Sequence, residues 1–195
     1  MSSEENLNSS LELILCGETM AEIEKKFLIY ENDKSFATKN LNEICSSIDA
    51  LKEKVLKEGT KIQQGYIPIE KGMELAKKLG LHVTFEPAEA RLRNKGGKYF
   101  FTIKGEGGTV RDELEVTIDQ HTFQHYWPAT EGKRVEKMRL KTPYEGQTAE
   151  VDVYLDRKLI VAEVEVGTLE EAEHMRALGK DVTKDKAYKN KNLAK

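Results

Sequence analysis

The chain has 195 residues, of which 38% are hydrophobic and 33% are charged. This length predicts one domain, large enough to fold without disulfides or a structural metal. Because 31 basic residues stand against 34 acidic ones, the composition argues against a general nucleic-acid-binding protein, which would be strongly basic.

The sequence contains no run of about 18 apolar residues, so it predicts no membrane-spanning helix. The two cysteines, Cys16 and Cys45, are too few for a disulfide framework or a zinc site. We therefore expect a cytoplasmic protein with neither a membrane nor a nucleic acid as its partner. Association into a homodimer stays open.

Residues 1–19 are polar and lack a sustained period, which predicts a flexible tail ahead of a single domain over residues 20–195. The elements that follow are predicted from apolar spacing and from turn residues. In chain order they are a strand at 22–29, a helix at 40–58, a strand at 61–67, a helix at 70–80, strands at 89–94, 98–104 and 110–118, a helix at 119–126, strands at 133–142, 147–156 and 158–166, and a helix at 168–178.

Most of these strands alternate strictly between charged and apolar residues. Each strand therefore has one ionic face and one apolar face. The charged set comprises Glu22, Glu24, Lys26, Arg91, Arg93, Lys104, Glu113, Glu115, Lys137, Arg139, Lys141, Glu150, Asp152, Glu163 and Glu165.

An antiparallel sheet with one face in water would explain this alternation. Two details favour a closed sheet instead: charges of one sign group within a strand, and short turns link many strands. With helices outside, the ionic face would line a lumen. That lumen must be hydrated, because isolated buried charges are too costly. Its carboxylates suit a hard cation such as Mg²⁺ or Mn²⁺, and its arginines and lysines suit phosphate. Together they suggest a polyphosphate ligand.

The order of these motifs resembles the CYTH family, also called the triphosphate tunnel metalloenzymes. Glu22-x-Glu24-x-Lys26 resembles the signature that opens the family, and Arg91-x-Arg93 resembles a later strand. The remaining similar segments are Phe100 to Gly107, Glu113-Leu-Glu115, Lys137-Met-Arg139, Glu150-Val-Asp152, Glu163-Val-Glu165 and Val182 to Asn190. The resemblance covers about residues 21–195.

The resemblance implies an α+β fold, with an eight-stranded antiparallel closed β-barrel and helices packed outside. The helices at 40–58 and 70–80 would be insertions. It implies metal ligands among Glu22, Glu24, Asp152, Glu163 and Glu165. The implied phosphate ligands are Lys26, Arg91, Arg93, Lys104, Lys137, Arg139 and Lys186.

Other roles stay open at this point. Tyr66 resembles a tyrosine that works beside the signature lysine Lys26 in bacterial members, or it is an aromatic residue of the barrel wall. Glu113 and Glu115, with Glu150 in support, either orient the bases or bind metal. The basic segment at 184–191 is either a frayed tail or a cover over one tunnel end that brings Lys186 inward.

The resemblance implies metal-dependent hydrolysis of a triphosphate, with inorganic tripolyphosphate as the expected substrate. A class IV adenylate cyclase and a thiamine or nucleoside triphosphatase are the rival enzymes. A polyphosphate-binding module is the non-enzymatic alternative, but such a module would not need metal carboxylates.

Overall fold

The computed structural model describes residues 23–37, 39–106 and 112–195. The predicted tail at 1–19 and the metal-ligand candidate Glu22 lie outside these residues. The described residues form one antiparallel sheet with several helices, which confirms the predicted α+β class.

The strands lie close to where the alternation predicts them. They are β1 (Ile23–Glu31), β2 (Lys34–Ser35), β3 (Thr60–Ile67), β4 (Pro87–Lys95), β5 (Lys98–Gly105), β6 (Glu113–Ile118), β7 (Arg134–Tyr144), β8 (Gln147–Tyr154), β9 (Leu159–Val166) and β10 (Lys180–Asp181).

The helices are η2 (Lys39–Glu43), α1 (Ile48–Glu58), α2 (Ile69–Lys78), α3 (Gln120–Tyr126), η3 (Trp127–Thr130), α4 (Leu169–His174), η4 (Lys186–Tyr188) and α5 (Asn190–Leu193). Most of the helices connect these strands and pack on the outer face of the sheet, whereas η4 and α5 lie on the inner face. None of the helices in the described part of the chain combines the length and the apolar character needed to cross a membrane.

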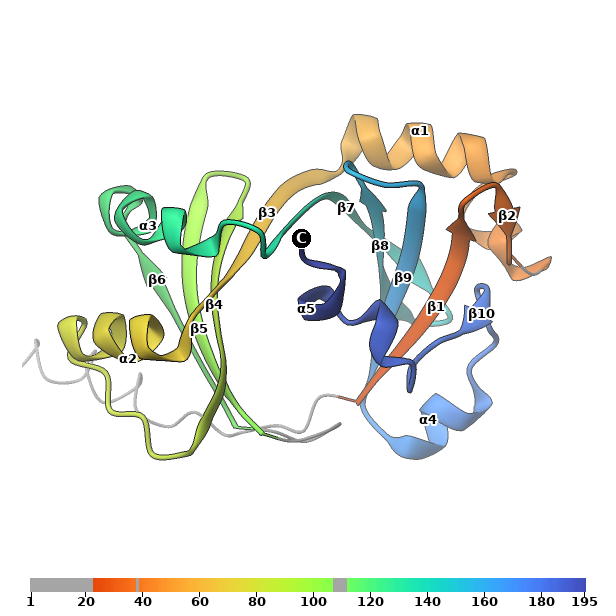
Figure 1. Cartoon of the computed structure of the whole chain (residues 1–195). Coiled ribbons are helices and arrows are strands. Elements are labelled where there is room, and N and C mark those ends of the chain that lie inside the picture. Colours follow the sequence, from red (N-terminus) through yellow and green to blue (C-terminus); the bar gives the residue numbers. More distant parts are fainter. Residues whose placement is uncertain (1–22, 38, 107–111) are drawn as a thin grey trace, which may run out of the picture.

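The strand order is β10-β1-β9-β8-β7-β3-β4-β5-β6, and β2 pairs with β1 beside this path. Figure 1 shows that the sheet bends at the β3–β7 pairing, so that two arms face each other. The first arm is β10-β1-β9-β8-β7, and the second arm is β3-β4-β5-β6. Helix α5 lies between the arms, and the longer helices lie on the outside (Figure 1).

Among the described residues the sheet does not close into the predicted eight-stranded barrel, because β6 and β1 are not paired. The free edge of β1 is used elsewhere. β10 pairs with β1 at Phe27 and Leu28, and β2 pairs with it at Tyr30 and Glu31. A backbone hydrogen bond from Val182 N–H to the Lys26 carbonyl extends this cover. The edge that β6 would need is therefore largely occupied.

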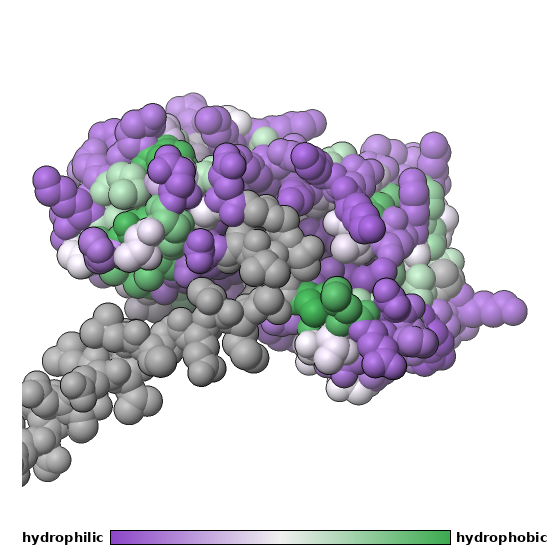
Figure 2. Space-filling view, turned by 90° about the horizontal axis from the view of Figure 1, so that it is seen from below, coloured by the Kyte–Doolittle hydropathy of each residue, from purple (hydrophilic) through white to green (hydrophobic). Residues whose placement is uncertain are grey.

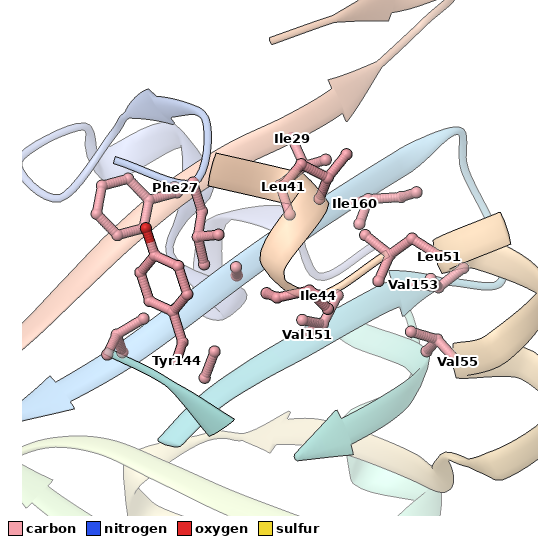
Figure 3. Close-up of a cluster of buried hydrophobic side chains, with 14 of the residues drawn as sticks. Phe27, Ile29, Leu41, Ile44, Leu51, Val55, Tyr144, Val151, Val153 and Ile160 are labelled. Atoms are coloured by element: carbon pink, nitrogen blue, oxygen red, sulfur yellow. The ribbon is translucent and has the colours of Figure 1, made fainter. Parts of the chain in front are cut away.

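The apolar residues of the first arm form the largest core, on its outer face. Figure 3 shows Leu51 and Val55 of α1 lying over Val151 and Val153 of β8, and all four side chains are buried. Alternation places these valines opposite the ionic residues of β8. Burying such side chains stabilises the fold by roughly 1.5–3 kcal/mol each.

Two further cores complete the packing. Leu92 and Phe101 of the second arm are buried outside the sheet beneath α2 and α3, together with Leu75 and Phe123. A smaller core on the inner face joins Leu28, Val135, Tyr154, Leu159, Val161 and Val182, with Tyr188 and Leu193 packed against it. The surface seen in Figure 2 is mostly hydrophilic, as expected when the apolar faces are used in this way.

Two predicted helices differ from the structure. The helix at 40–58 is split into η2 and α1, because Ser47 caps α1 by accepting a hydrogen bond from Ala50 N–H. The helix at 168–178 begins with the predicted capping box at Thr168 but ends at His174. Gly179 does not cap it. A Cβ at Gly179 would lie 2.3 Å from the Leu28 carbonyl oxygen, so glycine is needed there for close packing against β1.

Candidate active site

The inner face of the curved sheet carries the ionic residues of both arms. Their alternation with buried apolar residues is as the sequence predicts, and the longer helices α1, α2 and α3 lie on the opposite face. Strand pairing then sets which charges are neighbours. Lys26 lies opposite Glu163, Glu163 opposite Glu150, and Glu150 opposite Lys141, in one row across four strands. We call the ionic residues of the first arm the first cluster: Glu24, Lys26, Lys137, Arg139, Glu150, Asp152, Glu163 and Glu165.

The centre of the first cluster is the carboxylate of Asp152, which is completely buried. Its Oδ1 accepts from Arg139 Nε at 2.6 Å, and its Oδ2 accepts from Arg139 Nη2 at 2.6 Å and from Lys137 Nζ at 2.5 Å. Arg139 also contacts Glu150 and donates from Nη2 to Glu163 Oε2 at 2.7 Å. The guanidinium thus joins three carboxylates, as the two-sided donor geometry of arginine permits.

Lys26 connects this centre to the edge of the first arm. Its Nζ lies 2.8 Å from Glu163 Oε1 and 3.4 Å from Glu24 Oε1. Burial alone would lower the pKa of Lys26, but the charges of Glu163 and Glu24 outweigh it and raise that pKa. Lys26 therefore stays protonated and can donate hydrogen bonds to an anion.

The two glutamates beside Lys26 have opposite electrostatic environments. Burial and the negative charge of Glu163 raise the pKa of Glu24. Burial also acts to raise the pKa of Glu163, but the nearby Lys26 and Arg139 outweigh it and lower that pKa. Glu163 is thus held ionised by the two bases, whereas ionised Glu24 is repelled by the charge of Glu163. A cation placed beside Glu24 would relieve this repulsion.

Glu24 also faces Glu165 directly across the β1–β9 pairing. Like charges directly opposite one another destabilise a sheet unless a cation lies between them. Arg139 supplies such a cation between Glu150 and Glu163, but no basic side chain of the described residues bridges Glu24 and Glu165. In the described ranges no three His, Cys, Asp or Glu side chains converge as a metal site, and Glu22 lies outside those ranges.

The second cluster lies on the second arm and comprises Arg91, Arg93, Thr102, Lys104, Glu113 and Glu115. The Thr102 hydroxyl donates to Glu115 Oε2 at 2.7 Å and accepts from Arg91 Nη2 at 3.2 Å. Arg93 Nη2 donates to both oxygens of Glu115, at 2.8 and 3.0 Å. Lys104 contacts Glu113. Burial opposes ionisation of Glu115, but Thr102 and the two arginines lower its pKa.

Two hydrogen-bond donors of the second cluster find no acceptor in the described part of the chain. The Nε atoms of Arg91 and Arg93 are buried and have no partner among the described residues. An unsatisfied buried donor costs roughly 1–3 kcal/mol. Each such group in a native structure needs an explanation, and a bound ion that accepts the hydrogen bond is one. The chemistry of this pair, two guanidinium groups on alternate residues of β4, suits an anion with several oxygens.

Tyr66 and Tyr154 lie on the inner face beside the ionic residues. Tyr66 is buried on β3 opposite Arg91, and its hydroxyl accepts from Gln64 Nε2 at 2.6 Å. Tyr154 lies opposite Lys137, and burial together with the charge of Asp152 raises its pKa. The catalytic role of Tyr66 stays a prediction, and so does the alternative of an aromatic residue in the wall of the sheet.

The C-terminal segment covers one end of the inner face. Asn190 Oδ1 accepts from Tyr154 OH at 2.7 Å and from Lys137 Nζ at 3.3 Å, and Lys191 Nζ reaches the Ala88 carbonyl on the second arm at 3.1 Å. The segment therefore contacts both arms. Lys186, the predicted phosphate ligand, is exposed on η4 and forms no ion pair among the described residues.

Known proteins share this fold and sequence over most of the chain. An inorganic triphosphatase of Acetivibrio thermocellus is 31% identical over 182 residues, which are 89% of this chain and 93% of the relative. The chain belongs to the CYTH family, in its inorganic triphosphatase branch. An inorganic triphosphatase of Nitrosomonas europaea is 46% identical over 113 residues, which are 54% of this chain and 74% of the relative. No protein-family model matches the chain.

A solved structure supports the same assignment to the CYTH family. The crystal structure of the inorganic triphosphatase NE1496 matches with a TM-score of 0.54 at 32% identity, over 89% of this chain and 93% of that chain. The resemblance inferred from the ordered motifs is thereby confirmed at the level of the family.

The charge pattern that indicates the CYTH family misses several neutral or less obvious residues of the site. Thr102 lies on the same face of β5 as Lys104, and Gln64 lies on the same face of β3 as Tyr66. The two-residue repeat of a strand could therefore have placed both residues on the inner face from the sequence alone. Glu89 lies on the same face as Arg91 and is buried opposite Lys104. The contact of Asn190 with Lys137 has no signal in the sequence, because it depends on where the C-terminal segment docks.

Proposed function

We propose that the protein hydrolyses inorganic tripolyphosphate to pyrophosphate and orthophosphate, and that it requires Mg²⁺ or Mn²⁺. The observation that carries this proposal is the pair of ionic clusters on facing arms, in which two arginine Nε donors have no acceptor among the described residues. The relatives from Acetivibrio thermocellus and Nitrosomonas europaea are inorganic triphosphatases, which supports the same reaction.

The basic residues of the two clusters suit a substrate with three linked phosphoryl groups. Arg91, Arg93 and Lys104 present donors from the second arm. Lys26, Lys137 and Arg139 do so from the first arm, where they are now paired with carboxylates. These ion pairs keep the cations charged and positioned before the anion arrives, which reduces the reorganisation that binding requires.

The residues that best fit a divalent cation are Glu24, Glu163 and Glu165. Glu24 and Glu165 face each other without a bridging base among the described residues, and Glu24 is next to Glu163 through Lys26. Mg²⁺ and Mn²⁺ prefer such carboxylate oxygens. When bound, the ion neutralises phosphate oxygens and makes water more acidic. Glu163 would exchange Lys26 or Arg139 for the ion, because these two bases use both of its oxygens. Asp152 is less available, because it is completely buried and Arg139 and Lys137 use both of its oxygens.

In the proposed reaction a water oxygen bonds to the terminal phosphorus, and the bond to the bridging oxygen breaks. Pyrophosphate leaves with the bonding electrons, and the water proton passes to a nearby carboxylate. Lys26 and Arg139 stabilise the charge that develops on the transferred and leaving oxygens. Tyr66 remains the further catalytic candidate.

We also propose that the tunnel expected from the sequence forms when the arms approach each other around the bound anion. In this proposal the arms approach each other without strand pairing between β6 and β1, because β10 and β2 already occupy much of the β1 edge and leave little room for β6. An anion that contacts Arg93 on one arm and Arg139 on the other would draw the arms together. Small-angle X-ray scattering should then show a smaller radius of gyration with tripolyphosphate and Mg²⁺ than with Mg²⁺ alone.

The test of function offers the purified chain tripolyphosphate, ATP and thiamine triphosphate, each with Mg²⁺ or Mn²⁺. The proposal predicts that orthophosphate is released fastest from tripolyphosphate and that EDTA stops the release. Cyclic AMP and pyrophosphate from ATP would identify an adenylate cyclase instead. Tight binding of tripolyphosphate without turnover of any of the three would identify a binding module, and either result would refute the proposal.

A further inference from the structure

The C-terminal segment, residues 182–195, is anchored to the first arm near both of its ends. Val182 N–H donates to the Lys26 carbonyl at 2.9 Å, and Lys26 N–H donates to Thr183 Oγ1 at 3.0 Å. At the other end, Lys195 and Arg134 exchange two backbone hydrogen bonds, at 3.0 and 3.1 Å. Helix α5 lies between these anchors in the sequence and between the two arms in space (Figure 1). These contacts dock the segment without using the side chains of α5.

Asn190, the first residue of α5, brings its side chain to the first cluster. The residue is half-buried, and its Oδ1 accepts from Tyr154 OH at 2.7 Å and from Lys137 Nζ at 3.3 Å. An ammonium group can only donate a hydrogen bond, so the amide atom that faces Lys137 must be the oxygen. The amide of Asn190 thus offers a neutral acceptor to a cation of the candidate site.

Lys137 has three N–H donors and uses two of them within the described part of the chain. One goes to Asp152 Oδ2 at 2.5 Å and one goes to Asn190. Because the ammonium nitrogen is tetrahedral, fixing two of its N–H directions also fixes the third. The ring of Tyr154, whose centroid lies 5.6 Å from Lys137 Nζ, packs on another side of the ammonium group. The third donor is therefore the one left for a phosphoryl oxygen.

The charge of the acceptor decides how much attraction Lys137 keeps for an anion. The carboxylate of Asp152 is shared, because its Oδ2 also accepts from Arg139 Nη2 at 2.6 Å. A second carboxylate in the place of Asn190 would pair with Lys137 and repel a phosphoryl group. A neutral amide instead orients the ammonium group and leaves its charge available to the substrate.

We propose that Asn190 is a positioning residue whose amide oxygen orients the Lys137 ammonium group, so that one N–H points at a phosphoryl group of the bound triphosphate. This inference rests on the proposed function and adds to it an uncharged residue of the C-terminal segment. Because Asn190 acts through Lys137, its contribution to binding vanishes when Lys137 is replaced. If Asn190 only docked the segment, its replacement would cost the same with or without Lys137.

The test is a double-mutant cycle on the binding of tripolyphosphate to the full chain, with Asn190→Leu, Lys137→Met and the double variant. Isothermal titration calorimetry in EDTA gives the dissociation constants without metal-dependent turnover. Leucine is close to asparagine in size but cannot accept a hydrogen bond. Asn192→Leu is the matched control, since it makes the same change on α5, where Asn192 Nδ2 donates to the Lys186 carbonyl of the same segment.

Thermal midpoints report whether each variant folds. Lys137→Met should fold, because Arg139 still donates to both oxygens of Asp152. If Lys137→Met does not fold, the comparison of Asn190→Leu with Asn192→Leu decides. If the wild-type chain hydrolyses tripolyphosphate but binds it too weakly in EDTA, KM replaces the dissociation constant in the same cycle. Lost substrate binding raises KM and leaves kcat unchanged, so a lower kcat at constant KM would contradict the inference.

Asn190→Leu should weaken the binding of tripolyphosphate on the order of tenfold in the wild-type background, and by less than about twofold in the Lys137→Met background. Asn192→Leu should bind as the wild type does. The inference alone is overturned by wild-type affinity in Asn190→Leu, by an equal loss in both backgrounds, or by an equal loss in Asn192→Leu. A wild-type chain that neither binds tripolyphosphate nor releases orthophosphate from it would overturn the proposed function as well.

Discussion

Asp152→Asn tests whether the buried ion pairs of the first cluster support the fold. The substitution keeps the size of the side chain but removes its charge. Lys137 is 2% exposed and Arg139 is mostly buried, and both donate to the two oxygens of Asp152. Glu150 and Glu163 still neutralise Arg139 in the variant, but Lys137 loses its only ion-pair partner among the described residues.

Removing one partner of a buried ion pair typically costs about 3–5 kcal/mol, because it leaves an uncompensated charge. For a chain of this length, about 2–4 °C of midpoint temperature is lost per kcal/mol, so the expected loss is about 6–20 °C. Burial and the charge of Arg139 already lower the pKa of Lys137. If the substitution lowers the pKa of Lys137 further in the folded state, the folded variant binds fewer protons than the unfolded variant between about pH 7 and about pH 9. Its stability deficit should therefore shrink as the pH rises from about 7 to about 9.

The assay is urea unfolding followed by circular dichroism, in EDTA so that bound metal does not contribute. Lys137→Met/Asp152→Asn should be more stable than Asp152→Asn alone, because the unpaired charge is gone. Asp33→Asn, which breaks an exposed ion pair with Lys158, is the control and should leave the unfolding midpoint unchanged. A deficit below about 1 kcal/mol, or a double variant weaker than the single one, would refute the reasoning.

Three further predictions concern turnover and pH. Thr102→Val removes the hydroxyl that joins Glu115 to Arg91, so KM for tripolyphosphate should rise by roughly tenfold in steady-state assays while Thr102→Ser restores it. Glu24→Gln should abolish orthophosphate release and leave the thermal midpoint near that of the wild type; full activity would remove Glu24 from the proposed metal site. The lowered pKa of Glu163 predicts stability that is complete above its unfolded value of about 4.3 and is lost as the pH falls below it. Thermal scans from pH 6 to pH 3 should show this loss, and Glu163→Gln should reduce it.

The ionic inner face could be predicted because strands repeat every two residues. In β8, Glu150 and Asp152 alternate with Val151 and Val153, and the structure places the two pairs on opposite faces. The partners of each charge could not be predicted in the same way. That Lys26 meets Glu163 follows from the pairing of β1 with β9, which are far apart in the sequence.

The open sheet also had no signal in the sequence. β10 has two residues, Lys180 and Asp181, and so short a strand shows no alternation. It forms because the chain after α4 returns to β1. The split between η2 and α1 was hidden for another reason. Leu41 and Leu51 pack into the same core on either side of the break, so the apolar spacing continues across it.

β6 ends the sheet and has no further strand beside it among the described residues. Such an edge invites two copies of a protein to join strand to strand and aggregate. Glu113 and Glu115 alternate along β6, so antiparallel joining of two such edges would bring acidic side chains of both copies together on one face. The carboxylates that orient Arg91 and Arg93 therefore also discourage unwanted self-assembly through this strand.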